Sequence, residues 1–150
     1  MNSTKARFLL DLNALIALAD HDHEFHEVIQ KWFISSGNVG WGVCPLTEAG
    51  FVRVTTNPAY RGPARTIGQA TAILAGFATH PGYRYWPIAD KWAVLTAPFS
   101  ARVLGHQQVT DAYLLGLAIK EMGVLVTFDK GIKYLAGTDY TRNLLVLDES

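Results

Sequence analysis

Cysteine is nearly absent from this sequence, because Cys44 is the single one in 150 residues. A disulfide within the chain and a zinc site made mainly of thiolates are therefore excluded, and the composition fits a reducing cytoplasm. Long apolar runs are missing too, since none approaches the roughly 20 residues that span a bilayer. The apolar stretch near the N-terminus contains Asp11 and Asn13, whose polarity opposes its use as a signal peptide. We expect a cytoplasmic protein that does not enter the membrane.

Charge is scarce and balanced. Charged residues make up 17% of the chain, and 13 basic residues offset 13 acidic ones. This low fraction, together with 49% hydrophobic residues, argues against disorder and allows a real core. A protein that coats nucleic acid without specificity usually carries a basic excess. Any nucleic-acid binding by this chain must therefore be local, transient or aided by a metal ion.

Apolar runs that predict strands alternate with patterns that predict helices. Strands are expected at residues 7–10, 39–44, 83–86, 124–128 and 144–147. Helices are expected at about 13–19, 22–36, 45–54, 67–77 and 110–122, with Asp22 and Thr110 as N-caps and Gly37 and Gly123 as stops. Because the strands are continuously apolar, they predict a parallel sheet covered on both faces. We predict one domain over residues 1–150, a three-layer α/β/α sandwich with a central, mainly parallel sheet.

Four of the thirteen acidic residues stand at the same kind of place. Asp11 follows the first predicted strand, and Asp129 follows the strand at 124–128. Glu48 and Asp111 each lie in the first turn of a predicted helix. In a parallel α/β sheet, strand C-termini and helix N-termini fall on one edge, where ligands bind. We therefore expect the four carboxylates to meet in one pocket.

Carboxylates that lie within a few ångströms of one another repel and cannot all ionise unaided. A hard divalent cation removes this repulsion, since Mg²⁺ and Mn²⁺ take carboxylate and water oxygens, and the reaction that suits such a site is metal-assisted phosphodiester hydrolysis. Taken singly, each acid has a plainer explanation, because the helix macrodipole favours an acid in a first turn. The combination favours a site, because Asp11 and Asp129 interrupt apolar runs in which a buried charge is costly.

Six segments carry a resemblance to a known family. They are LLDLNALIALAD at 9–20, HxxH at 23–26 before a helix with Trp32, CPLTEAGFVRVTTNPAY at 44–60, HPGYRYWP at 80–87, QVTDAYLLGLA at 108–118 and VTFDKGI at 126–132. In their order and spacing, over nearly the whole chain, the sequence resembles the PIN-domain ribonucleases. Within that family it is most similar to the VapC-type toxins of type II toxin–antitoxin systems.

The resemblance implies roles for particular residues. The family's acidic quartet corresponds to Asp11, Glu48, Asp111 and Asp129. Asp11 and Asp111 would bind Mg²⁺ or Mn²⁺ directly, Asp129 directly or through water, while Glu48 would complete the site and orient water. Two polar neighbours would orient the carboxylates, namely Asn13 and Thr127. An activated water attacks a phosphodiester of RNA, so no Ser, Cys or His nucleophile is needed.

The family also implies partners. A VapB-like antitoxin would cover the acidic groove with its C-terminal segment, and two copies of the toxin would form a homodimer. The free toxin would arrest growth by cutting a specific RNA. Neither the RNA target, nor the antitoxin, nor the number of metal ions follows from the resemblance.

Two polar groups outside the quartet leave alternatives open. The tract Asp20–His26 (DHDHEFH) could bind zinc through histidine and carboxylate groups, or could simply begin a solvated helix. Arg53, Arg61 and Arg65, with Tyr60 beside them, could hold an RNA backbone and stack a base. The plainer role of the arginines is to keep a surface loop soluble.

Three other functions compete with the ribonuclease. A Mg²⁺-dependent phosphatase needs a second Asp two residues after its nucleophile, but Asn13 stands at that position after Asp11. A phosphoacceptor receiver domain needs an acidic pair after its first strand, and that pair is absent. A PIN fold without activity would be a binding module, which the complete quartet disfavours. A monoester phosphatase assay would test the first alternative, and a metal titration would separate the other two from the enzyme.

Overall fold

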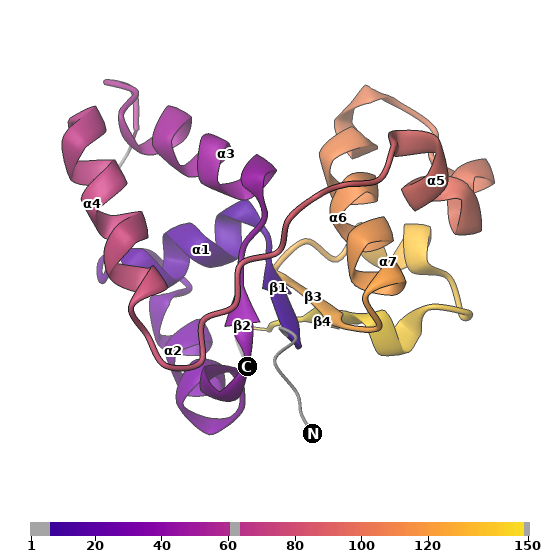
Figure 1. Ribbon diagram of the computed structural model, residues 1–150, viewed down its shortest axis with the longest axis horizontal. Helices are drawn as coiled ribbons and strands as arrows, with labels where there is room; N and C mark the ends of the chain where they lie inside the picture. Colours follow the sequence, from indigo (N-terminus) through magenta and orange to yellow (C-terminus); the bar gives the residue numbers. More distant parts are fainter. Residues whose placement is uncertain (1–6, 61–63, 149–150) are drawn as a thin grey trace.

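The sheet at the centre of the molecule has four strands, all parallel, in the order β2-β1-β3-β4 (Figure 1). A computed structural model of the chain describes residues 7–60 and 64–148. The strands are short, with β1 at Phe8–Leu10, β2 at Trp41–Gly42, β3 at Val124–Thr127 and β4 at Leu144–Val146. The prediction of a mainly parallel sheet is confirmed. All four strands therefore end at the same edge.

Helices lie on both sides of this sheet (Figure 1). One side carries α1 at Leu12–Ala19, α2 at His26–Ser35, α3 at Pro45–Thr55 and α4 at Ile67–Ala78. The other side carries α5 at Trp92–Thr96, α6 at Val109–Lys120 and α7 at Ile132–Ala136. The predicted three-layer α/β/α sandwich is confirmed. Within the described part of the chain, no helix is long and apolar enough to cross a membrane.

Side chains of the central strands alternate between two hydrophobic cores. Leu9 and Leu125 are fully buried in the core that contains α6 and α7. Phe8, Leu10 and Val126 belong to the core that contains α1, α2 and α3. Because each face of the sheet has its own core, both sets of positions must be apolar, which explains the continuous apolar runs of the sequence.

The strand predicted at residues 83–86 does not form as a regular strand. The segment runs extended beside β2, where the Arg84 N–H donates to the Trp41 carbonyl at 2.8 Å and the Trp86 N–H to the Val43 carbonyl at 3.0 Å. One parallel bridge, between Trp41 and Tyr83, is its β pairing. The prediction of a strand over 39–44 was also too long, because a 3₁₀ turn occupies Gly37–Val39 and leaves β2 two residues. So short a neighbour cannot support a full ladder.

Both N-caps predicted from the sequence are wrong. α2 begins at His26 instead of after Asp22, because the His23 N–H donates to the Asp20 carbonyl at 3.0 Å and the Phe25 N–H to His23 Nδ1 at 3.0 Å. These bonds hold residues 20–25 in turns. α6 begins at Val109, directly after a 3₁₀ turn at 106–108, so Thr110 lies inside the helix.

The predicted stop of α6 at Gly123 is also displaced. The helix ends at Lys120, and Met122 is the residue with positive φ, at 57°. Gly123 is needed for space, because a Cβ there would lie 2.6 Å from the Trp86 ring and 2.8 Å from the Arg7 carbonyl oxygen. The glycine signal was therefore real, but it marks a close approach of β3 to its neighbours rather than the helix cap.

Candidate active site

Asp11 stands where β1 ends and α1 begins, at the carboxyl edge of the sheet. Its backbone is extended, and its Oδ1 accepts a hydrogen bond from the Ala14 N–H at 2.9 Å. This is the arrangement of an N-cap, for which Asp is a favoured residue. The side chain is nevertheless only 6% exposed. A cap on the surface would serve the helix equally well, so burial of this carboxylate needs another reason.

Thr127 links Asp11 to Asp129. Its Oγ1 donates to Asp11 Oδ2 at 2.5 Å and accepts from the Asp129 N–H at 3.0 Å. Thr127 is the last residue of β3 and is fully buried. Asp129 Oδ1 accepts in turn from the Gly131 N–H at 2.8 Å. The hydroxyl therefore orients one carboxylate and holds the backbone of another, which suits the orienting role predicted for it.

Asp111 reaches the same edge from the opposite helical layer. It lies half-buried in the first turn of α6, whereas Asp11 precedes α1 on the other side of the sheet. The gap between the two groups of helices in Figure 1 opens above this edge. Three side chains separated by up to 118 positions in the chain thus lie toward one edge of the sheet, whereas the predicted meeting of all four acids in one pocket stays a prediction.

The charges of these three carboxylates interact. The pKa of Asp11 is raised from 3.8 to about 6, first by burial and then by the charges of Asp111 and Asp129, against the lowering effect of its two hydrogen bonds. Burial is also the main cause that raises the pKa of Asp111 to about 6, followed by the charge of Asp129. Such mutual repulsion costs stability unless a cation or a proton relieves it.

The chemistry of the donors fits a hard divalent cation. All three groups offer carboxylate oxygens, which Mg²⁺ and Mn²⁺ prefer, and an ion would turn their repulsion into attraction. Among the described residues, no three Asp, Glu, His or Cys side chains converge closely enough to hold an ion as they stand. Mg²⁺ is commonly held by only one or two carboxylates together with water, which suits two direct ligands.

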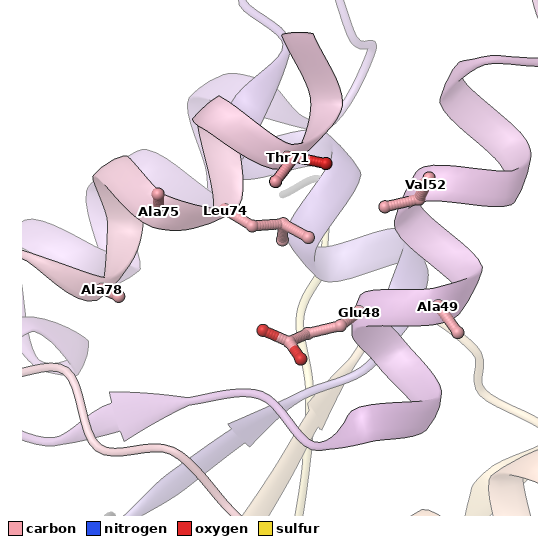
Figure 2. Close-up of a pocket in the computed structure, with 7 residues that line it drawn as sticks. All are labelled: Glu48, Ala49, Val52, Thr71, Leu74, Ala75 and Ala78. Carbon is pink, nitrogen blue, oxygen red and sulfur yellow. The ribbon is translucent and has the colours of Figure 1, made fainter. Parts of the chain in front are cut away.

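Glu48 has a different setting from the three aspartates. It lies in the first turn of α3, and its side chain points into a pocket between α3 and α4 (Figure 2). The pocket measures about 410 Å³, and small or apolar residues of the two helices form most of its wall. Glu48 is not among the charges that raise the pKa values of Asp11 and Asp111. Its place in the predicted quartet stays a prediction.

Two tyrosines near Glu48 were missed by the sequence analysis. Burial raises the pKa of Tyr83 to about 12, with the charge of Glu48 as the next cause, and the same two causes raise the pKa of Tyr85. The signal was present in the segment YRYW, because alternate residues of an extended chain share one face. Asn13, by contrast, is exposed on α1 and makes no side-chain hydrogen bond within the described residues, so its predicted role stays untested.

The histidine tract begins a helix. His26 is buried, its Nδ1 lies 2.7 Å from the Ala17 carbonyl oxygen, and its ring centre lies 4.8 Å from that of His21. These contacts join α2 to α1.

The family profile of the PIN domain matches residues 8–137. The protein belongs to the PIN-domain family. The matched range contains Asp11, Glu48, Asp111 and Asp129, so the whole predicted quartet lies within the PIN domain.

Curated relatives of this PIN domain are VapC ribonucleases of Mycobacterium tuberculosis. Ribonuclease VapC38 is 44% identical over 128 residues, which cover 85% of this chain and 89% of the relative. Ribonuclease VapC44 is 37% identical over 145 residues, which cover 93% and 97% of the two chains. The resemblance to VapC-type PIN-domain ribonucleases is confirmed.

Solved structures show the same fold at low identity. The structure of VapBC2 from Rickettsia felis, bound to a DNA fragment from its promoter, contains a chain that matches with a TM-score of 0.63 and 13% identity. The match covers 94% of this chain and 98% of the other. FitAB bound to a DNA fragment contains another, with a TM-score of 0.57, 18% identity, and coverage of 86% and 90%. The PIN fold is thus retained where the sequences have diverged widely.

Proposed function

We propose that this PIN-domain protein is a Mg²⁺-dependent endoribonuclease and the toxin of a toxin–antitoxin pair, with one PIN domain over residues 1–150. The observation that carries the proposal is the placement of Asp11, Asp111 and Asp129 at the carboxyl edge of the sheet, where burial first, and then the neighbouring carboxylate charges, raise the pKa of Asp11 and Asp111. Clustered acids that are costly to the fold are a mark of a functional site. The similarity to VapC ribonucleases supports RNA hydrolysis as the reaction.

Each side chain has a proposed task. Asp11 and Asp111 hold the cation directly, and Asp129 holds it directly or through water. Glu48 completes the site from α3 by rotating out of its pocket. A bound Mg²⁺, or Mn²⁺ in its place, supplies the Lewis acid for phosphodiester hydrolysis. Thr127 keeps the Asp11 carboxylate turned in one direction through the bond from its hydroxyl.

The same acidic edge defines the proposed partners. The substrate is RNA, whose phosphates approach the three carboxylates only when a cation neutralises them. A VapB-like antitoxin covers this edge and keeps the toxin inactive, and two copies of the toxin form a homodimer in the cytoplasm. The solved chains of similar fold, in VapBC2 and FitAB, support an assembled rather than an isolated protein.

The proposal is tested with purified protein, freed of any partner, and total bacterial RNA. We expect discrete cleavage products with Mg²⁺ and none with EDTA. Asp11→Asn and Asp111→Asn should each abolish cleavage, because each removes a proposed ligand of the cation. Sequencing the new RNA ends identifies the target.

A matched control tests whether the loss of RNA cleavage is specific to the acids of the proposed site. Asp139 is an acid with 73% of its side chain exposed, and Asp139→Asn should cleave RNA like the wild type. Calorimetry with Mg²⁺ and Mn²⁺ is the companion measurement. Intact RNA in every condition, together with no heat of metal binding, would refute the enzyme and leave a PIN-fold binding module.

A further inference from the structure

The three arginines around the loop between α3 and α4 have unequal surroundings. Arg65 is committed to the fold, because its guanidinium pairs with the buried carboxylate of Asp20 and lies 5.9 Å from the centre of the Phe51 ring. Tyr60 donates to the same carboxylate. Arg61 lies outside the described residues. Arg65 is therefore unable to bind a phosphate without breaking its ion pair with Asp20.

Arg53 is an exposed cation with no hydrogen bond or ion pair inside the described part of the chain. It lies in the last turn of α3, the helix whose first turn carries Glu48. Its guanidinium carries five N–H donors, in a fork that matches the oxygens of a phosphate. An exposed arginine that pairs with no described residue is free to attract an RNA phosphate, even though the net charge of the chain is zero.

The packing of α3 on α1 places this guanidinium near the start of α1. Arg53 Nη2 lies 3.7 Å from the point that a Cβ on Gly50 would occupy, and Leu12 Cδ2 lies 3.1 Å from the same point. Leu12 directly follows Asp11 in the chain. The Arg53 guanidinium and the Leu12 side chain therefore lie over the same glycine, next to the first residue of the helix that Asp11 caps.

Arg53 does not pair with the carboxylates of the proposed site. It is not among the charges that shift the pKa of Asp11 or Asp111. A cation at this remove cannot neutralise the scissile phosphate, but it can hold a neighbouring phosphate of the same strand. Phosphate contacts of this kind fix the position of a nucleic acid and do not read its sequence.

We propose that Arg53 is a positioning residue that binds an RNA phosphate adjoining the one that is cleaved. This inference rests on the proposed ribonuclease function, because it assigns a substrate contact to that site. Arg53 takes no part in bond cleavage. Its task is to hold the strand across the carboxyl edge, so that the scissile phosphodiester faces Asp11 and Asp111.

The test measures binding of a fluorescent single-stranded 12-nucleotide RNA of mixed sequence at several salt concentrations, with Ca²⁺ in place of Mg²⁺ to prevent cleavage while the three aspartates are kept. Arg53→Ala should weaken binding about fivefold near 0.1 M salt, and should lower the slope of log K against log salt by about 0.7. Arg53→Lys should keep the slope, because it keeps the charge. Arg142 is an exposed arginine just before β4, at the opposite edge of the sheet, and Arg142→Ala should leave affinity and slope unchanged.

The outcomes separate this inference from the proposed function. If Arg53→Ala binds RNA with wild-type affinity and slope, or if Arg142→Ala weakens binding equally, the phosphate contact is refuted even when the wild type cleaves RNA. If Arg53→Ala weakens RNA binding as expected but the wild type cleaves no RNA, the phosphate contact is supported and the proposed ribonuclease activity is refuted. Arg53→Ala should also raise KM more than it lowers kcat and should unfold at the wild-type temperature, since a structural role would move the unfolding temperature instead.

Discussion

The hydroxyl of Thr127 connects two carboxylates that would otherwise be oriented independently. It donates to Asp11 and accepts from the backbone of Asp129, and it does so without any exposure to water. Its hydrogen bond lowers the pKa of Asp11, whereas burial raises that pKa more strongly. The Thr127 hydroxyl therefore stabilises the charged form of Asp11, whereas burial destabilises that form.

We predict that Thr127→Val lowers RNA cleavage by about 10-fold or more and the free energy of unfolding by about 1 kcal/mol, because the new methyl group cannot donate to Asp11. Thr127→Ser keeps the hydroxyl and should retain most of both. Cleavage kinetics and urea denaturation measure the two effects. A valine variant with wild-type kcat and Mg²⁺ dependence would remove the orienting role.

At the scale of elements, two glycines show how packing changes the effect of one added methyl group. A Cβ at Gly123 would meet the Trp86 ring at 2.6 Å and the Arg7 carbonyl at 2.8 Å, whereas a Cβ at Gly76, in the exposed helix α4, would meet nothing within 4 Å. We predict that Gly123→Ala destabilises the protein by about 2 kcal/mol through the clash. Gly76→Ala should stabilise it by about 0.5–1 kcal/mol through helix propensity. Urea denaturation of both variants is the measurement, and equal effects would contradict the packing described for Gly123.

The buried ion pair of Asp20 and Arg65 joins the end of α1 to the residues before α4. We predict that Arg65→Ala costs about 3 kcal/mol of unfolding free energy, because it leaves the Asp20 carboxylate buried without its partner. Lys120→Ala removes the more exposed pair with Asp90 and should cost much less stability, because solvent screens a surface ion pair. Chemical denaturation compares the two. Similar losses would mean that the Asp20 pair carries no more of the fold than a surface contact.

For the whole molecule, the two raised pKa values make stability depend on pH. A carboxyl whose pKa is higher in the folded state binds its proton more tightly there, so its stabilising effect is complete below the unfolded pKa and is lost as pH rises through the folded value. Asp11 and Asp111 move from 3.8 to about 6. The metal-free protein should therefore lose stability between about pH 4 and pH 7.

Asp111→Asn supplies the check on this pH dependence. In EDTA it should flatten the loss and, at pH 7.5, should be more stable than the wild type by about 1 kcal/mol, once solvent screening of this half-buried group is allowed for. Mg²⁺ should raise the unfolding temperature of the wild type and leave that of the variant nearly unchanged. Parallel pH profiles for the two proteins would show that the carboxylates do not repel as described.

Local pattern in the chain was sufficient for the parallel sheet and its two covered faces, and it placed Asp11 and Asp129 at the edge where their strands end. Continuous apolar runs require burial on both faces. All strands of a parallel sheet end at the same edge, so the residues that follow them share that edge whatever the order of the strands in the sheet. Both conclusions depend on residues close together in sequence and on a general property of parallel sheets.

Tertiary structure decided much of the rest. Local turns at residues 20–25 displaced the start of α2, whereas the two-residue β2 left the distant segment at 83–86 without a ladder. Asp20 pairs with Arg65, whereas Arg53 pairs with no described residue, and the side chain of Glu48 lies in the pocket between α3 and α4. No local pattern distinguishes two arginines on either side of one loop, or says which way a glutamate on a helix turns. Those outcomes depend on which partners the folded chain brings within reach.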